Sequence, residues 1–131
     1  MRIGPQVDDV LSSADAVDIA IASTAVIYTK AFKLTYGEYF ALAYIATSSG
    51  TVDLTIELEQ SFQAPATEGA ADDNYVEPEG MANIAAVSDE NMHVKAINPV
   101  PMPWGRFKIT GGASNDASTT IRLRLAKQEE V

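Results

Sequence analysis

Hydrophobic and polar residues alternate most cleanly between residues 51 and 60, where every second side chain is aliphatic. Successive side chains of a β-strand leave opposite faces of the sheet, whereas a helix would spread these aliphatic residues around its axis. The segment is therefore predicted to be a strand with one face on the core and the other in water. The aliphatic positions are Val52, Leu54, Ile56 and Leu58, and the polar ones between them are Thr51, Asp53, Thr55, Glu57 and Glu59.

The same alternation returns in residues 121–125, with basic instead of acidic residues at the polar positions. If the two strands lie side by side or one strand apart, the acidic side chains of the first can meet the arginines of the second across the sheet. Such exposed pairs contribute roughly a few tenths of a kcal/mol each, but they help to select register and partner. The predicted cross-strand ion pairs involve Asp53, Glu57, Glu59, Arg122 and Arg124.

Residues 39–46 are apolar at every position, which favours a central strand covered on both faces, although alanine and leucine also suit a short helix. Residues 48–50 are small and contain a glycine, and they are predicted to turn this strand into the next one as a hairpin. β-Branched and aromatic residues predict a further strand over residues 26–34. The other predicted strands cover residues 17–22, 91–97, 106–110 and 121–125, with Phe107 and Ile109 facing inward.

Three stretches lack a strand period. Residues 1–15 mix small and acidic side chains and are predicted to be a flexible N-terminal arm. Residues 61–90 form a long acidic excursion punctuated by proline and glycine, with a short strand or helical turn expected near residues 81–86. Residues 128–131 are a polar tail. The sequence thus predicts an all-β, single-domain antiparallel β-sandwich or jelly roll over residues 16–127, made of seven or eight short strands.

Charge excludes one class of partner and suggests another. The formal net charge is −9 in 131 residues, which argues against nucleic-acid binding. No lysine or arginine occurs between Lys33 and Lys95, whereas basic residues outnumber acidic ones from Lys95 to Lys127. This polarity predicts either acidic and basic strands side by side in one sheet or a head-to-tail contact between copies. No apolar run reaches the ~20 residues of a membrane span, and no secretory signal is expected.

Few residues offer catalytic chemistry. The chain has no cysteine and one histidine, His93, which is predicted to point outward from its strand. Acidic pairs such as Asp72 with Asp73 and Asp89 with Glu90 could serve as acid–base groups or calcium ligands, but they lie in loops and lack the EF-hand spacing. No phosphate-binding glycine loop or serine-nucleophile motif occurs. We therefore predict no enzyme, no cofactor, no metal and no small-molecule ligand.

Two segments are candidates for contacts with other proteins. Three prolines in five positions force an extended backbone before Trp104, the only tryptophan, which serves either as a core anchor or as part of a docking surface. The N-terminal arm carries apolar residues that can rest on a neighbour. The candidate contacts are Ile3, Pro5, Val7, Pro99, Pro101, Met102, Pro103 and Trp104.

The order of these features resembles that of small head decoration, or cement, proteins of tailed phages. The shared pieces are a Ser49-Gly50-Thr51 turn into an alternating strand, a long excursion, the strand Arg106-Phe107-Lys108-Ile109, the turn at Gly111-Gly112, and a last alternating strand over residues 118–125. The resemblance covers about the last 85 residues. Such proteins often carry a tryptophan in the middle excursion, and this chain has only Phe62 and Tyr75 there.

The resemblance implies a virion structural protein that stabilises a shell by binding across neighbouring capsid subunits. It implies a homotrimer in contact with the major capsid protein, made in the host cytoplasm and placed on the capsid surface. An alternative is a carbohydrate-binding or adhesion module, with stacking aromatics drawn from Tyr36, Tyr39, Tyr75 and Trp104. A hydrolase would require a cleft that brings His93 and carboxylates together.

Overall fold

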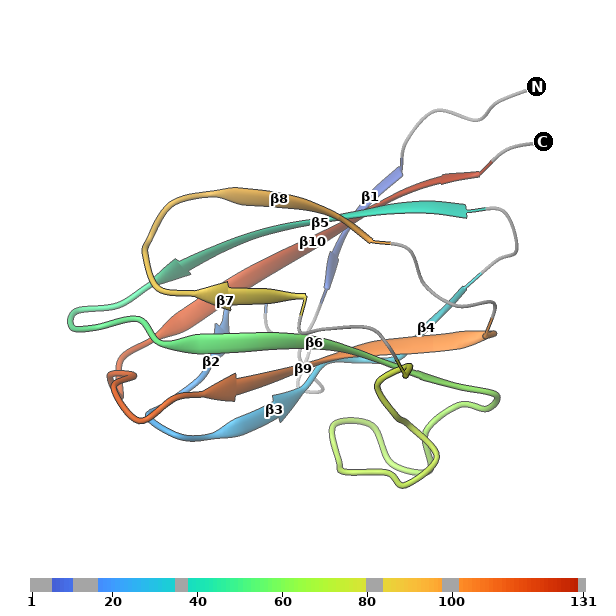
Figure 1. Ribbon diagram of the computed structural model, residues 1–131, viewed down its shortest axis with the longest axis horizontal. Coiled ribbons are helices and arrows are strands. Elements are labelled where there is room, and N and C mark those ends of the chain that lie inside the picture. The colour runs from blue at the N-terminus through green and yellow to red at the C-terminus, as the bar shows by residue number, and fades with distance from the viewer. Residues whose placement is uncertain (1–5, 11–16, 35–37, 80–83, 98–101, 130–131) are drawn as a thin grey trace.

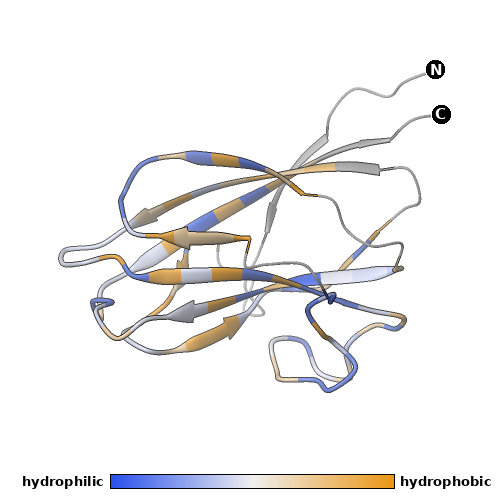
Figure 2. Ribbon diagram, in the orientation of Figure 1, coloured by the Kyte–Doolittle hydropathy of each residue, from blue (hydrophilic) through white to orange (hydrophobic). Residues whose placement is uncertain are grey.

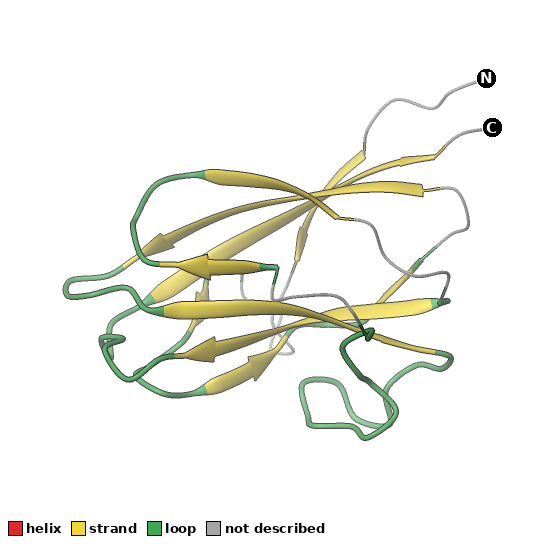
Figure 3. Cartoon of the chain, in the orientation of Figure 1, coloured by secondary structure: helices red, strands yellow, loops and turns green. Residues whose placement is uncertain are grey.

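The computed structural model describes residues 6–10, 17–34, 38–79, 84–97 and 102–129 (Figure 1). These ranges contain strands and loops, and no helix long and apolar enough to cross a membrane occurs in them (Figure 3). The strands are β1 (Gln6–Val10), β2 (Ile19–Ala20), β3 (Val26–Tyr28), β4 (Phe32–Lys33), β5 (Glu38–Thr47), β6 (Leu54–Ser61), β7 (Ala85–Val87), β8 (His93–Ile97), β9 (Trp104–Gly111) and β10 (Thr120–Glu129).

The strands form two antiparallel sheets that pack face to face, as the sequence predicts. One sheet has the order β1-β10-β5-β8, with β2 also paired to β10, and the other has the order β3-β9-β6-β7, with β4 also paired to β9. Figure 1 shows the two sheets as upper and lower layers. The prediction of an all-β sandwich is confirmed.

The pairing within the sheets is nested. β6 pairs with β7, β5 with β8, β3 and β4 with β9, and β1 and β2 with β10. The chain is thus a long two-stranded ribbon that turns back between β6 and β7. The ribbon is rolled up so that β10 also meets β5 and β9 also meets β6. This topology is a jelly roll.

The core lies between the sheets and follows the alternation seen in the sequence. Along β6 the burial alternates, and Leu54 and Ile56 are at most 1% exposed. Ile121 and Leu123 of β10 face them from the other sheet and are equally buried. Figure 2 shows the alternation as bands of colour along both strands. Phe107 and the other predicted inward residues are also confirmed, since each is at most 5% exposed: Val52, Leu58, Ile109 and Leu125.

The predicted hairpin at residues 48–50 is wrong, because β5 and β6 belong to different sheets and residues 48–53 cross between the two layers. The single strand predicted over residues 26–34 is two strands, β3 and β4. Thr29 separates them: its side chain is fully buried and its hydroxyl accepts a hydrogen bond from Phe107 N (2.9 Å). A side chain thus replaces a backbone acceptor at this point of the ladder.

The three stretches predicted to be irregular are all more regular than expected. In the predicted polar tail, Gln128 and Glu129 belong to β10, and residues 130–131 lie outside the described residues. Gln6–Val10, within the expected N-terminal arm, form β1 and pair with β10 at the edge of the sheet. The rest of that arm lies outside the described residues. In the excursion, β7 confirms a short strand close to the expected position, and an isolated bridge joins Gln60 to Val76.

Candidate interaction surfaces

The acidic side chains of β6 face the basic side chains of β9, not those of β10. In the register of the sheet, Glu57 lies opposite Lys108 and Glu59 lies opposite Arg106. The predicted pairing of β6 with Arg122 and Arg124 is therefore wrong, because β10 lies in the other sheet. Alternation along a strand shows which of its residues face the core, but it does not show which sheet the strand joins.

Asp53 and Arg122, which also belong to the predicted ion-pair set, have local partners. The Asp53 carboxylate accepts a hydrogen bond from Ser114 N (3.2 Å) in the turn between β9 and β10. Arg122 Nε donates to Asp18 Oδ1 (3.1 Å), in an exposed pair beside β2. Arg124 is exposed on β10. Exposed pairs of this kind contribute little to stability, so their main effect is on local charge.

Arg106 is 1% exposed, and its guanidinium group contacts two aromatic rings, a carboxylate and a backbone carbonyl. Its guanidinium lies between two aromatic rings, 4.2 Å from the centroid of Tyr28 and 4.6 Å from that of Tyr75. Nε donates to Glu59 Oε1 (3.0 Å) and Nη1 donates to the carbonyl oxygen of Ala70 (2.7 Å). Buried charges require such pairing, and cation–π contacts gain strength when water is excluded. We call Arg106, Tyr28, Tyr75 and Glu59 the arginine clamp.

The arginine clamp fixes the long loop after β6 against the outer face of the sheet. Tyr75 donates its hydroxyl proton to the carbonyl oxygen of Gln63 (2.6 Å), and the backbone of Val76 pairs with that of Gln60. Burial raises the pKa of Tyr75 to about 12. Burial also raises the pKa of Glu59, against the opposing effect of its hydrogen bond with Arg106. The loop is therefore a shaped element rather than a loose connection.

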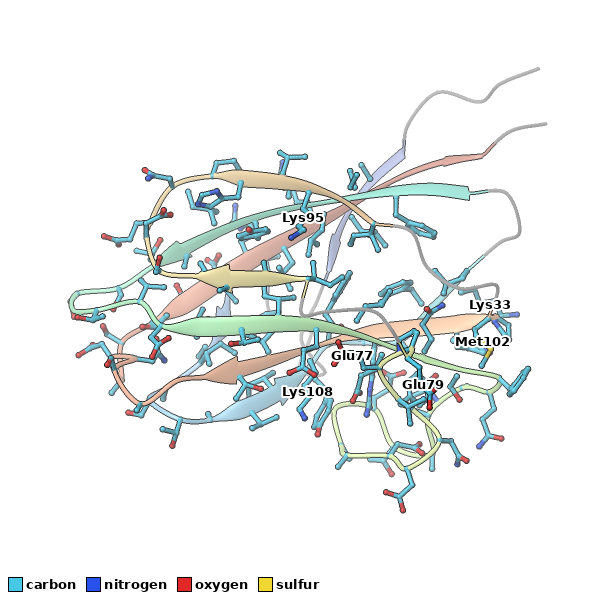
Figure 4. The ribbon with its side chains drawn as sticks, in the orientation of Figure 1. Lys33, Glu77, Glu79, Lys95, Met102 and Lys108 are labelled. Carbon is cyan, nitrogen blue, oxygen red and sulfur yellow. The ribbon has the colours of Figure 1, made fainter. Side chains whose placement is uncertain are left out.

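The clamped loop presents apolar side chains to solvent. Phe62 is 79% exposed and Val76 is 56% exposed, and both lie close to the Gln60–Val76 bridge. Acidic residues follow Val76, and burial together with the nearby Glu57 carboxylate raises the pKa of Glu77. Figure 4 labels Glu77 near Lys108 of β9, with which it interacts electrostatically, and Glu79 further along the loop. The loop surface is thus apolar at two points and acidic beside them.

Only part of the proline segment can be placed. Met102 and Trp104 are half-buried and Pro103 is exposed, while Pro99 and Pro101 lie outside the described residues. Lys33 Nζ lies 5.4 Å from the centroid of the Trp104 ring. Trp104 begins β9, so its position suits a core-edge anchor and leaves its role in binding a prediction. The candidate contacts in the N-terminal arm also remain predictions. Ile3 and Pro5 lie outside the described residues, and Val7 is placed only as part of β1.

The prediction that His93 points outward from its strand is wrong, because His93 lies opposite the core-facing Tyr44; it is half-buried and forms a local pair at the edge of the sheet. Its Nε2 lies 2.7 Å from Asp89 Oδ1, and its ring stacks on Tyr44 at a centroid distance of 5.3 Å. The hydrogen bond from His93 is the main reason that the pKa of Asp89 lies below its usual value. Among the described residues, no group of three or more histidine and carboxylate side chains could hold a metal ion.

A network of hydroxyl groups joins the β5–β6 loop to the β9–β10 loop at the same end of the sandwich. Ser49 donates to Ser118 Oγ from its backbone N (2.9 Å) and from its hydroxyl (2.8 Å). Ser118 in turn donates to the carboxylate of Asp116, and Thr119 donates to Ser48 Oγ (3.1 Å). These serines satisfy one another and hold the loops together, which is a structural use of their hydroxyls.

Tyr75 cannot serve in the predicted aromatic platform for carbohydrate, because it is buried. Tyr75 is 3% exposed and its ring is occupied by Arg106. The ring of Trp104 lies under Lys33. Tyr36 is outside the described residues, and of Tyr39 only the backbone position in β5 is described.

The outer face of the β1-β10-β5-β8 sheet is apolar along its two last strands. Three successive outward positions of β5 are Ala41, Ala43 and Ile45, and the outward positions of β8 are Val94 and Ala96. The apolar run at residues 39–46 predicts a strand covered on both sides. No segment of the described chain covers its outer side, where these residues stay half-buried or exposed.

No protein-family model matches the sequence, and no curated protein matches it. Among solved structures, a chain of the T13 viral particle of infectious bursal disease virus is 14% identical with a TM-score of 0.49, over 96% of this chain and 31% of that one. Chains of the Gx and Gt strains of the same virus give 15% and 14% identity, TM-scores of 0.47 and 0.45, and coverage of 97% and 96% of this chain and 33% of each of theirs. This chain spans about a third of their length. Likeness at this level is no guide to function.

Proposed function

We propose that this chain is a non-enzymatic structural protein of a virion, which decorates and stabilises a phage capsid by binding across neighbouring capsid subunits. The observation that carries the proposal is the clamped loop between β6 and β7. Long loops in small domains are usually either functional or disordered, and this one is held by a buried arginine between two tyrosines. A loop fixed in this way presents Phe62 at little entropic cost, as a binding element should.

Two further features agree with a role in assembly. The jelly roll supplies a rigid scaffold whose outer surfaces can vary independently of its core. The order of strands, excursion and turns also resembles that of phage cement proteins. The proposed partners are the major capsid protein and further copies of this chain, and the proposed place is the capsid surface after synthesis in the host cytoplasm.

Co-sedimentation with capsid shells tests the proposal. Shells from the virus that encodes the chain, stripped of this protein, are mixed with the purified wild type and with Phe62→Ser. We expect the wild type to bind and to raise the melting temperature of the shell, and Phe62→Ser to bind at least tenfold more weakly because exposed aromatic anchors dominate such contacts.

Val26→Ser is the matched control. Val26 is also an exposed apolar residue, 44% exposed, but it lies on β3 outside the loop. We expect Val26→Ser to bind like the wild type, and circular dichroism should show that both variants fold. Failure of the wild type to bind shells would overturn the proposed function, and equal binding by Phe62→Ser would remove the loop from the contact.

A further inference from the structure

The clamped loop between β6 and β7 combines exposed apolar side chains with a fixed backbone. At 79%, Phe62 is the most exposed large apolar side chain among the described residues, and Val76 is 56% exposed. Both lie next to the Gln60–Val76 bridge, and the arginine clamp holds the rest of the loop on the sheet. Side chains displayed in this way lose little conformational entropy when a partner binds them.

The same loop is acidic along its length. Residues 61–79 contain five carboxylates and no lysine or arginine. Asp73 and Glu79 are exposed, and neither has a hydrogen-bond or ion-pair partner in the described part of the chain. Glu68 and Asp72 accept hydrogen bonds from backbone N–H groups. These bonds hold the pKa of Asp72 below its usual value, so Asp72 stays ionised in neutral solution.

The basic residues of β9 do not neutralise this charge. Arg106 is 1% exposed and is already paired with Glu59. Lys108 lies opposite Glu57 and near Glu77, so two carboxylates share one ammonium group (Figure 4). The pKa of Glu77 is raised by burial and by Glu57, and the opposing effect of Lys108 does not reverse this. Negative charge is therefore in excess around the apolar residues.

The excess remains when the whole neighbourhood is counted. On β3, β4, β9 and the β3–β4 connection, the cations are Lys30, Lys33, Arg106 and Lys108, and Lys33 lies over the Trp104 ring. On the loop and the outward positions of β6, the carboxylates are Glu57, Glu59, Glu68, Asp72, Asp73, Glu77 and Glu79. Seven carboxylates thus face four cations.

This charge selects the kind of partner that can dock on the loop. A second copy of this chain, with a net charge of −9, would be repelled, and so would nucleic acid and anionic lipid. A basic protein surface would be attracted. An exposed phenylalanine next to the charge suits a partner that also offers an apolar pocket.

We propose that the clamped loop docks on a different protein, with Phe62 and Val76 in an apolar pocket and the loop carboxylates against lysine and arginine side chains that border it. This protein is a capsid subunit under the proposed function, on which the inference rests. The two parts of the contact act at different steps. Complementary charge speeds the encounter, whereas apolar contact forms on docking and slows dissociation.

Salt separates these two steps. Shells stripped of this protein and immobilised on a sensor surface give both rate constants for the full chain. Raising NaCl from about 0.1 M to about 1 M shortens the Debye length from about 10 Å to about 3 Å. We expect the association rate constant to fall about tenfold and the dissociation rate constant to change less than about twofold. An association rate that is independent of salt, or that rises with salt, would overturn the basic border.

Removing carboxylates tests their position. Asp73→Asn combined with Glu79→Gln should slow association about threefold or more at 0.1 M salt and weaken the salt dependence. Ser88→Lys combined with Thr24→Lys is the matched control, because it changes the net charge by the same amount. Both control positions are exposed, in turns at the opposite end of the sandwich from the loop (Figure 1). The control should associate like the wild type, and equal effects of the two double variants would overturn the proposed contact.

Phe62→Ser tests the apolar pocket. It should raise the dissociation rate constant about tenfold and leave the association rate constant within about twofold of the wild type. An unchanged dissociation rate would overturn the pocket, and circular dichroism should show that every variant folds. A wild type that binds shells without the salt effect would overturn this inference alone. A wild type that does not bind shells at any salt concentration would overturn the proposed function with it.

Discussion

The two outer faces of this jelly roll differ in polarity and in what covers them. On the β3-β9-β6-β7 sheet, outward positions carry Glu57, Glu59 and Lys108, and the chain's own loop closes over Arg106. On the β1-β10-β5-β8 sheet, outward positions of β5 and β8 carry alanine, valine and isoleucine, and no described part of the chain covers them. The inner faces are alike, so the difference lies in what each outer face meets. One face is covered by the chain's own loop, and the other is left open by the described chain.

The largest effect should come from opening the covered face. Arg106→Met removes the guanidinium from between the two tyrosines and leaves the Glu59 carboxylate and the Ala70 carbonyl without their partner. Breaking a buried pair in this way costs about 3 kcal/mol or more. Urea unfolding followed by tryptophan fluorescence should show that loss.

Lys108→Met is the control for this change. Lys108 also points outward from β9, two residues further along, but it is half-buried and sits at the edge of the loop. We expect a change below about 1 kcal/mol, as for other exposed charges. A similar loss in both variants would mean that the arginine clamp adds nothing specific.

A smaller effect should follow from loosening the loop without removing the ring. Tyr75→Phe keeps the contact with Arg106 and deletes the hydrogen bond to Gln63, at a cost of about 1 kcal/mol. The raised pKa of Tyr75, about 12, means that its contribution to stability is complete below the ordinary value near 10 and is lost as the pH rises towards 12. Ultraviolet titration of the phenols should show late ionisations for Tyr75 and for Tyr44, whose pKa is also raised by burial, and Tyr75→Phe should abolish only that of Tyr75.

On the uncovered face, substitution should hardly change the stability of the monomer. Val94→Thr replaces an exposed apolar side chain with one of the same shape and good strand propensity, so the change should stay within about 0.5 kcal/mol. Urea unfolding at low micromolar concentration measures this. A loss of more than 1 kcal/mol would show that the face is already covered within the monomer.

The smallest effect concerns the turn before β8, at the edge of the same sheet. The hydrogen bond from His93 holds the pKa of Asp89 below its usual value, so this contact stabilises the fold above the ordinary aspartate range and is lost as the pH falls through the lowered pKa. Carbon NMR of the carboxyl group should show a midpoint below 3.8 in the wild type. His93→Ala should raise it, and an unchanged midpoint would contradict the pairing.

The sequence predicts which residues face the core better than it predicts which strands are neighbours. Alternation in residues 51–60 and 121–125 correctly places the aliphatic residues in the core, because period two is a local property of a strand. The choice of sheet is not local: β6 pairs with β9 and not with β10, although both offer basic outward residues. Complementary charge alone therefore predicts the wrong neighbour for β6.

The arginine clamp was missed for a similar reason. Arg106 occupies an outward strand position, where arginine is ordinarily exposed, and its burial depends on Tyr75 and Ala70, which come from an excursion without any period. The apolar run at residues 39–46, in contrast, correctly predicted a central strand, since β5 lies between β10 and β8. The same run also predicts that something covers the outer face of β5, and no described segment of the chain does so.

The nested pairing has a consequence for how the protein is made. None of the described strands β1 to β6 pairs with another of that group, because each finds its partner among β7 to β10. A ribosome that has released only the first half of the chain has therefore exposed strands that cannot yet form a ladder. As the chain emerges, the first pair of described strands that it can form is β7 on β6, and the pair of β1 with β10 is among the last. Until β10 emerges, β1 and β2 lack their described partner and β5 lacks one of its two, so their edges stay open to other chains during synthesis.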